Sequence, residues 1–98
     1  MSNLEPAYNK ISTLPQRTEI TVRYEVARDV LNNMIAIVTG QIFAEQRKSM
    51  PDESALVELR ATRQRYVDER SGLSSNDFDA IRYIYEHYAP IVKHHVSE

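Results

Sequence analysis

The stretch VARDVLNNMIAIVTGQI, residues 26–42, decides the fold. Its apolar side chains recur at helical spacing and cover about half of the helical cylinder. An arc that wide cannot be buried by one neighbour, so the stretch predicts a central helix that contacts two others. Gly40 lies near the end of this stretch but in the interior of the predicted helix, where it weakens the helix by about 1 kcal/mol relative to Ala. We therefore expect either close packing by another backbone or a local bend at this glycine.

The residues before this helix carry a mixed signal. Apolar and polar residues alternate over residues 20–26, which is a strand pattern that soon gives way to the helical period. Residues 1–17 contain two prolines and show no clear period. We predict an N-terminal arm over residues 1–17, either loose or docked in extended form, followed by a helical domain over residues 18–98.

A second helix is predicted after SMPDES, residues 49–54. Ser49 can cap this helix, and Pro51 suits its first turn. Gly72 is expected to end it in the left-handed conformation that glycine tolerates.

The arginines of this second helix do not form one basic stripe, since Arg60 and Arg65 point to different sides. Arg65 and Glu69 are spaced for an ion pair along a solvated helix. Arg63 falls within the narrow apolar stripe. Its stem is expected to cover the edge of the core, or its guanidinium to pair with an acid at a subunit contact.

A third helix has the clearest predicted start, in LSSNDF, residues 73–78. Ser74 is expected to cap it, with Asp77 three residues later as the second residue of a capping box. Leu73, just before the cap, is expected to pack on Phe78 as a hydrophobic staple. Pro90 is expected to kink or end it. With two glycines in 98 residues, the chain is predicted to be all-α. The expected fold is a three-helix antiparallel bundle with a long central first helix and an extended N-terminal arm.

The tyrosines of RYIYEHYAP, residues 82–90, divide into two kinds. Tyr85 and Tyr88 share the apolar face of the third helix, so they are predicted core rings with hydroxyls at its rim. Tyr83 points away from that face, beside Asp79 and His87 at helical spacing. Because tyrosine is favoured at binding hot spots, Tyr83 is a predicted partner contact.

Two further residues, on the first and second predicted helices, are also predicted partner contacts. Phe43 lies on the polar side of the first helix, where packing within a monomer does not require an aromatic ring. Arg60 is available to an acidic partner or a phosphate group, although a solvated helix surface is the preferred interpretation of the arginines on this helix. The candidate partner-binding residues are therefore Tyr83, His87, Asp79, Phe43 and Arg60.

The sequence contains no arrangement typical of an enzyme. It lacks a Gly-rich phosphate loop, a cysteine and a serine in a nucleophile turn. His94 and His95 are adjacent and chelate poorly together on a helix, and His87 lies across Pro90 from them. We expect no catalysis, no cofactor and no metal, and we expect a protein that acts by binding.

Composition limits the location and the partners. A net charge of −2 does not favour nucleic acid, and the absence of cysteine excludes disulfides. The longest apolar run, residues 34–38, is far shorter than the roughly 20 residues that span a bilayer, and no secretory signal is evident. We expect a cytoplasmic protein with no membrane contact.

Four segments resemble a group of small antitoxin-like proteins that are encoded beside zeta-toxin-type kinases, including a kinase effector of plant-pathogenic bacteria. The resemblance covers roughly residues 18–93 and rests on segment order. The segments are ITVRYEVARDVLNNMIAIV, MPDES, VELRATRQRYVDER and SNDFDAIRYIYEHYAPIVK. It implies a protein that binds a P-loop kinase and inhibits it by occluding the nucleotide or substrate cleft.

Three other functions stay open from the sequence. Residues 20–24, ITVRY, are compatible with the strand of a ribbon-helix-helix DNA-binding autoregulator. Ser49 and Glu53 have the spacing of an inhibitor of Fic-type AMP transferases, although Ser54 stands where that motif has Gly or Asn. A chaperone for a neighbouring effector would bind its partner without inhibiting it.

Overall fold

The structure, a computed structural model, describes residues 16–97, and all regular elements in that range are helical. They are α2 (Gln16–Gln46), α3 (Glu53–Gly72), α4 (Phe78–Tyr83), the π-helix η1 (Ile84–Tyr88) and α5 (Ala89–Ser97). No strand occurs between residues 16 and 97, which agrees with the all-α prediction. The predicted arm over residues 1–17 lies outside the described residues, except that its last two residues already belong to α2.

Helix α2 is the centre of the fold. Its 31 residues extend for about 46 Å at the rise of an α-helix. It contacts α3 and also the elements α4, η1 and α5, which confirms the prediction of a central helix with two neighbours. The residues that it buries recur at helical spacing: Ala27, Val30, Leu31, Met34, Val38 and Ile42.

The strand pattern over residues 20–26 does not produce a strand, because α2 runs through it. A strand needs a neighbouring strand to pair its backbone N–H and C=O groups. The described residues offer none, whereas a helix satisfies these groups within its own segment.

Helix α3 begins later than the Ser49 cap predicts, so that prediction is wrong. Asp52 directly precedes the first helical residue, and its carboxylate accepts a hydrogen bond from the Ala55 N–H at 3.1 Å. The Asp52 N–H in turn donates to the Glu45 carboxylate at 2.8 Å, and the Lys48 ammonium lies 2.8 Å from the same group. Lys48, followed by the Asp52 N–H, lowers the pKa of Glu45. These contacts close the loop between α2 and α3.

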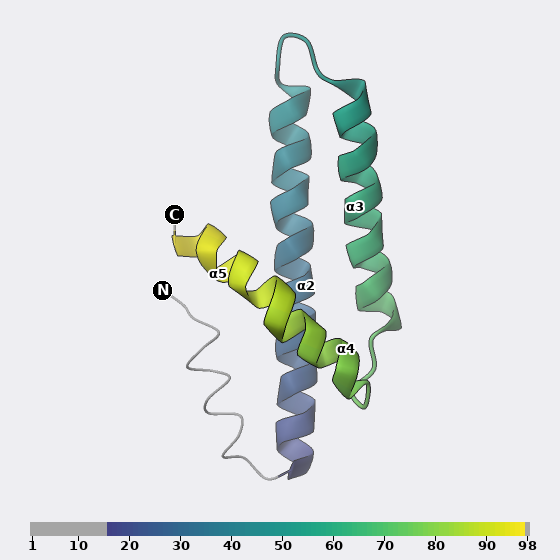
Figure 1. Cartoon of the computed structure of the whole chain (residues 1–98), viewed down its shortest axis with the longest axis vertical. Coiled ribbons are helices and arrows are strands. Elements are labelled where there is room, and N and C mark those ends of the chain that lie inside the picture. The colour runs from purple at the N-terminus through teal and green to yellow at the C-terminus, as the bar shows by residue number, and fades with distance from the viewer. Residues whose placement is uncertain (1–15, 98) are drawn as a thin grey trace.

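The predictions made for Gly72 and for Gly40 are both wrong. Gly72 does not adopt a left-handed conformation, and α3 ends where the Leu73 N–H donates to the Arg70 carbonyl at 3.4 Å. At Gly40, a methyl group built on the backbone would meet nothing within 4 Å outside its own helix. Helix α2 continues through Gly40 without a break (Figure 1). Neither a close neighbour nor a bend explains this glycine.

The arginines of α3 make different contacts: two of them bond to side chains of α2, and one pairs within α3. The Arg63 guanidinium donates to the Thr39 hydroxyl of α2 at 3.3 Å, so this arginine crosses the edge of the core within one chain. Arg70 donates to the Asn32 side chain of α2 at 2.6 Å. Arg65 lies 4.0 Å from Glu69, which confirms the predicted pair.

The elements α4, η1 and α5 follow one another without a break and are called the terminal rod, residues 78–97. Its cap is Asp77, whose carboxylate accepts from the Ala80 N–H at 3.3 Å, whereas the predicted cap, Ser74, donates to the Asn76 side chain at 2.7 Å. The Ser74 prediction is wrong because Asp77 directly precedes the first helical residue. Leu73 is buried and Phe78 is 57% exposed, and the predicted staple between them stays a prediction.

Pro90 does not end the terminal rod: it is the second residue of α5 and follows directly after the π-helix η1. Because proline has no backbone N–H, it cannot bond to the carbonyl four residues earlier. The turn before it widens into η1, where the Ala89 N–H bonds to the Ile84 carbonyl five residues back. The wider turn adjusts the direction of the chain and lets α5 continue to Ser97.

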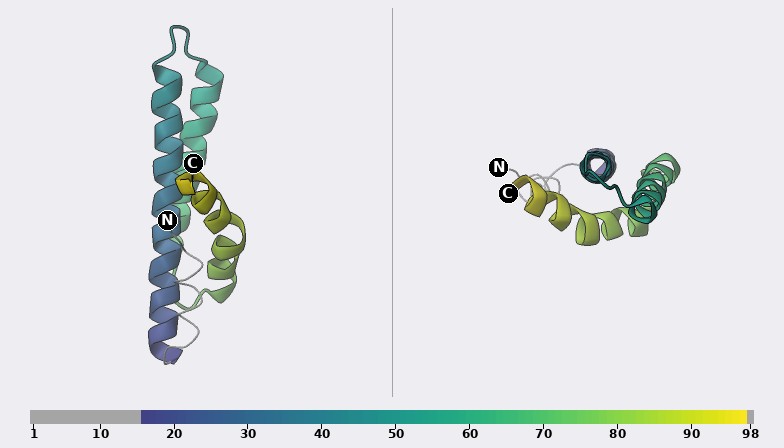
Figure 2. Two further views of the ribbon diagram at one scale, coloured as in Figure 1. Left: turned by 90° about the vertical axis from the view of Figure 1, so that its left-hand side faces the viewer. Right: turned by 90° about the horizontal axis from the view of Figure 1, so that it is seen from above.

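Helices α2 and α3 lie side by side as a hairpin, and the terminal rod crosses α2 obliquely (Figures 1 and 2). The molecule measures 53 × 29 × 15 Å, and its radius of gyration is 15.4 Å. A compact domain of about 100 residues would have a radius of gyration of about 13 Å. The fold is therefore a thin slab. The end of the hairpin near its loop projects beyond the terminal rod.

Candidate functional site

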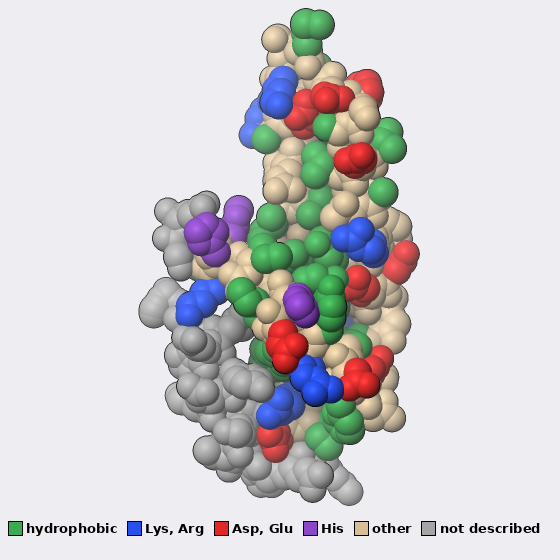
Figure 3. All heavy atoms as spheres, viewed as in Figure 1, with side chains coloured by type: hydrophobic (Ala, Val, Ile, Leu, Met, Phe, Trp, Pro, Cys, Tyr) green, Lys and Arg blue, Asp and Glu red, His purple; other side chains and the backbone are tan. Residues whose placement is uncertain are grey.

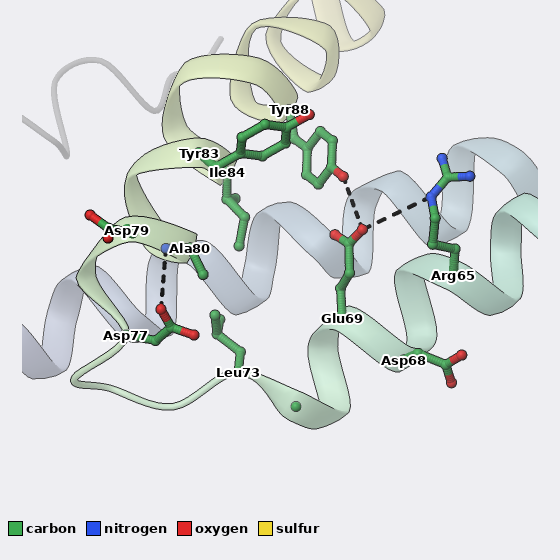
Figure 4. Close-up of a pocket in the computed structure, with 11 residues that line it drawn as sticks. Arg65, Asp68, Glu69, Leu73, Asp77, Asp79, Ala80, Tyr83, Ile84 and Tyr88 are labelled. Atoms are coloured by element: carbon green, nitrogen blue, oxygen red, sulfur yellow. Dashed lines mark hydrogen bonds and ion pairs between the residues drawn. The ribbon is translucent and has the colours of Figure 1, made fainter.

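A pocket with a volume of about 800 Å³ lies where the C-terminal end of α3 faces the start of the terminal rod. Figure 4 shows side chains from both elements converging on it. Its lining combines acidic, aromatic and aliphatic groups: Arg65, Asp68, Glu69, Gly72, Leu73, Asp77, Asp79, Ala80, Tyr83, Ile84 and Tyr88. We call it the acidic pocket.

The connection between α3 and α4 builds the pocket floor. Leu73 ends α3 and turns inward, where it is buried in the same apolar cluster as Ile84. Four residues later Asp77 starts α4. One short segment therefore closes the base of the pocket, and the two helices that diverge from it form the walls.

The charge of the pocket is mostly negative. Carboxylates of Asp68, Glu69, Asp77 and Asp79 line it, and Arg65 is the one basic side chain among the described residues of its lining. Because carboxylates outnumber basic groups here, the pocket attracts cations more than anions.

Glu69 connects the two walls. It accepts a hydrogen bond from the Tyr88 hydroxyl at 3.1 Å, and Arg65 approaches the same carboxylate oxygen (Figure 4). Burial of the Tyr88 phenol, with the nearby negative charge of Glu69, raises its pKa to about 12. Tyr88 therefore stays a neutral donor at physiological pH and holds the terminal rod to α3.

A row of aromatic rings runs from the core to the surface of the pocket. Tyr66 is buried and meets the ring of Tyr88 edge to face, with centroids 5.3 Å apart. Tyr88 meets Tyr83 in the same way at 5.5 Å, and Tyr83 lies against the His87 ring at 4.2 Å with a tilt of 35°. Such contacts restrict how a ring can turn. Tyr83 is therefore held in place although it is 51% exposed.

The predicted division of the tyrosines agrees with this arrangement. Tyr85 and Tyr88 pack against the core cluster, and their hydroxyls reach its rim. The Tyr85 hydroxyl donates to the Arg23 carbonyl of α2 at 3.0 Å. Tyr83 lies outside the core, as expected, and its role as a partner contact stays a prediction.

The structure brings together three of the five predicted contact residues. Tyr83 and Asp79 line the acidic pocket, and His87 stacks on Tyr83. Asp79 also pairs with Arg82 at 2.5 Å. The other two predicted residues lie on the hairpin, near its loop: Phe43, which is 53% exposed, and Arg60, which is also exposed.

The pocket also includes residues that the sequence did not indicate. Glu69, Asp68 and Arg65 belong to a helix that is separate in the sequence from Tyr83. Only the packing of α3 and the terminal rod on α2 places the two sets together. The acidic sequence SNDFD, residues 75–79, is a local signal for charge at this end of the rod: Asp79 is among the predicted contact residues, whereas Asp77 is predicted only as part of the helix start.

Within residues 16–97, no group of three or more His, Cys, Asp or Glu is placed to hold a metal ion. The same part of the chain has no helix that is both long and apolar enough to cross a membrane.

Two alternative functions lose their structural basis. Residues 20–24 lie within α2, so this segment is not the strand of a ribbon-helix-helix protein. Ser49 lies in the loop before α3, so Ser49 and Glu53 do not share the helix that the Fic-inhibitor motif requires.

Comparison with protein-family models found none that matches the chain, and searches of curated proteins and solved structures found no significant match.

Proposed function

We propose that this chain is an antitoxin-like inhibitory binding protein. Its partner is a P-loop kinase of the zeta-toxin type, and it acts by occluding the nucleotide or substrate cleft of that kinase. The observation that carries this proposal is the position of Tyr83. The ring is half exposed, is held by two aromatic neighbours, and stands at the wall of the acidic pocket.

A ring held in this way is suited to binding a partner. Tyrosine offers apolar area and a hydroxyl, and tyrosines at the centre of interfaces often dominate the binding energy. Because Tyr83 already rests against His87 and Tyr88, it loses little freedom when a partner covers it. Less lost freedom leaves more of the contact energy for affinity.

The charge of the pocket matches the chemistry of a P-loop kinase cleft. Such clefts hold phosphate groups with a lysine and with backbone N–H groups. The acidic pocket presents carboxylates beside an exposed ring, which is the combination of negative charge and flat ring that a nucleotide offers. Its carboxylates can therefore pair with basic side chains at the partner's cleft and block entry of the nucleotide.

One interface can supply the required affinity. Nanomolar binding corresponds to about −12 kcal/mol, and interfaces of about 1,600 Å² with a few anchoring residues reach it. The thin, elongated shape supports this use, because much of the surface of a 53 × 29 × 15 Å slab is accessible to a partner.

The proposal is tested by titrating the kinase with three variants of the full chain. Tyr83→Ala should weaken binding by about 2 kcal/mol, or about 30-fold, because it removes the anchoring ring. Its free energy of unfolding should change by no more than about 1 kcal/mol, because the ring is outside the core. Tyr83→Phe keeps the ring and should bind nearly as the native chain does. Asp79→Asn should weaken binding and reduce its dependence on salt.

Growth of cells that express both proteins separates an inhibitor from a chaperone. An inhibitor restores growth when the active kinase is present, and Tyr83→Ala should restore it less. A chaperone would raise the amount of soluble kinase without relieving toxicity. If Tyr83→Ala and Asp79→Asn both bind as the native chain does, the acidic pocket is not the interface.

A further inference from the structure

Phe43 and Arg60, the two predicted contact residues that lie on the hairpin, share one surface. The Arg63 guanidinium donates to the Thr39 hydroxyl at 3.3 Å and so marks where α3 and α2 meet. Phe43 follows Thr39 by four residues, about one helical turn nearer the loop of residues 47–52. Arg60 precedes Arg63 by three residues, which is also about one turn nearer that loop. Because this spacing keeps side chains on one side of a helix, Phe43 and Arg60 lie at about the same height on one surface of the hairpin.

Two more residues extend this surface. Arg47 follows Phe43 by four residues, and its backbone N–H donates to the Phe43 carbonyl at 3.1 Å, so its side chain lies about one turn beyond the ring. Val57 precedes Arg60 by three residues on α3. Phe43 is 53% exposed and Val57 is 64% exposed, and both arginines are exposed as well. We call Phe43, Arg47, Val57 and Arg60 the hairpin face.

The hairpin face points away from the terminal rod. Tyr66 and Glu69 of α3 contact Tyr88 of the rod. Val57 precedes Tyr66 by nine residues, and Arg60 likewise precedes Glu69 by nine residues. Nine residues are about two and a half helical turns, so the members of each pair point to opposite sides of α3. The view from above in Figure 2 shows the terminal rod along one side of the hairpin, and no other described element covers the opposite side.

Arg47 and Arg60 differ from the other arginines of residues 18–96 in having free guanidiniums. Within those residues, neither side chain makes a hydrogen bond or an ion pair. The others each bond to a carboxylate, a hydroxyl or an amide oxygen: Arg23, Arg28, Arg63, Arg65, Arg70 and Arg82. A guanidinium offers several N–H donors in one plane, and arginine and aromatic residues are enriched at binding hot spots. The hairpin face therefore combines two unused sets of donors with exposed apolar side chains.

We propose that the hairpin face binds an acidic segment of a partner protein. Carboxylates of that segment pair with Arg47 and Arg60, and an apolar side chain between them covers Phe43 and Val57. Charge complementarity identifies this occupant, because a carboxylate can accept two parallel hydrogen bonds from one guanidinium. The exposed ring adds apolar contact area that a lone anion would leave uncovered. The hairpin face shares no residue with the acidic pocket, so it is a second binding surface.

Two other occupants fit this surface less well. A second copy of the chain would bring its own hairpin face, and like charges that face each other across an interface repel. Nucleic acid would bring a dense row of phosphates, whereas Glu53 lies on the same side of α3, seven residues before Arg60. Figure 3 shows Asp and Glu side chains close to Lys and Arg side chains at the loop end of the hairpin. A short acidic segment avoids most of this repulsion, because it needs to meet only the two arginines.

Titration of the full chain with a synthetic peptide tests the inference. The probe is a fluorescent peptide of four Glu-Glu-Leu repeats, and its control has glutamine in place of each glutamate. The glutamate peptide should bind with a dissociation constant below about 1 mM, and its binding should weaken as the salt concentration rises. Arg60→Gln and Phe43→Ala should each weaken this binding about tenfold, because each removes one of the two kinds of contact.

Arg28→Gln is the matched control. It removes the same charge from α2, about 22 Å along the helix from Phe43, and should leave peptide binding unchanged. Circular dichroism checks that each variant is folded. The inference is overturned if both peptides bind alike, if neither binds, or if Arg28→Gln weakens binding as much as Arg60→Gln.

Two further measurements identify the other occupants. Sedimentation that shows a dimer of the native chain, which Arg60→Gln dissociates, would assign the hairpin face to a second copy and overturn the inference. Duplex DNA that binds with the same dependence on Arg60 would overturn it as well. The peptide titration contains no kinase, so its outcome is independent of the function proposed above.

Discussion

Replacing Gly40 with Ala should make the protein more stable. Gly40 lies in the interior of α2, is exposed and does not have a positive φ. The added methyl group would meet nothing within 4 Å outside its own helix. The substitution therefore creates neither a clash nor a new packing contact, and only the backbone preference changes.

The size of the stability change follows from the helix propensities of the two residues, because the added methyl group makes no tertiary contact. Glycine in a helix interior costs about 1 kcal/mol relative to alanine, mainly because the unfolded chain has more freedom to lose. Gly40→Ala should thus raise the free energy of unfolding by about 1 kcal/mol. For a domain of this size, the melting temperature should rise by about 4–8 °C.

Urea unfolding followed by circular dichroism measures this change. Gly72→Ala is the matched control, since a methyl group there also meets nothing within 4 Å. It stands at the last residue of α3, where the helix frays, so its gain should be smaller. A Gly40→Ala variant that is no more stable than the native chain would refute the reasoning. It would mean that another surface packs against Gly40 or that α2 does not run through it in solution.

Three further changes follow from the contacts described above. Tyr88→Phe should cost about 1 kcal/mol at neutral pH, because it removes the hydrogen bond to Glu69. The folded-state pKa of Tyr88 is raised to about 12, so its contribution is complete below pH 10 and is lost as the pH rises through 12. The native chain should therefore lose more stability than Tyr88→Phe over that range in urea titrations. Asp77→Ala should cost about 1 kcal/mol as the loss of a helix cap, and Ser74→Ala should cost clearly less in the same assay. Leu31→Ala, at a fully buried position of α2, should cost about 2–5 kcal/mol, and calorimetry that found under 1 kcal/mol would contradict the assigned core.

The acidic pocket shows which of its residues a local sequence pattern can predict and which it cannot. Tyr83, Asp79 and His87 share one exposed helix surface, and helical spacing was enough to group them. Glu69 stands on α3, and its contact with Tyr88 is formed between residues 19 positions apart. No period within one helix can predict such a contact, because it depends on how two helices cross.

The helix ends show a different limit. Ser49 and Ser74 are good caps by residue type, yet Asp52 and Asp77 take that role. Each loop offers several residues that can cap a helix, and only the one directly before the first helical residue has the right geometry. Where that residue falls depends on the contacts that close the loop, such as the one between Asp52 and Glu45.

The amino-acid sequence by itself determined that this chain is helical and that residues 26–42 form its centre. The apolar side chains repeat at the helical period over an arc too wide for one neighbour. Only the tertiary structure decided the direction of the terminal rod, the thin shape and the pairing of α3 with α4 around one pocket. Those features depend on contacts between distant residues and on the widened turn before Pro90, which redirects the chain in a way that no local period encodes.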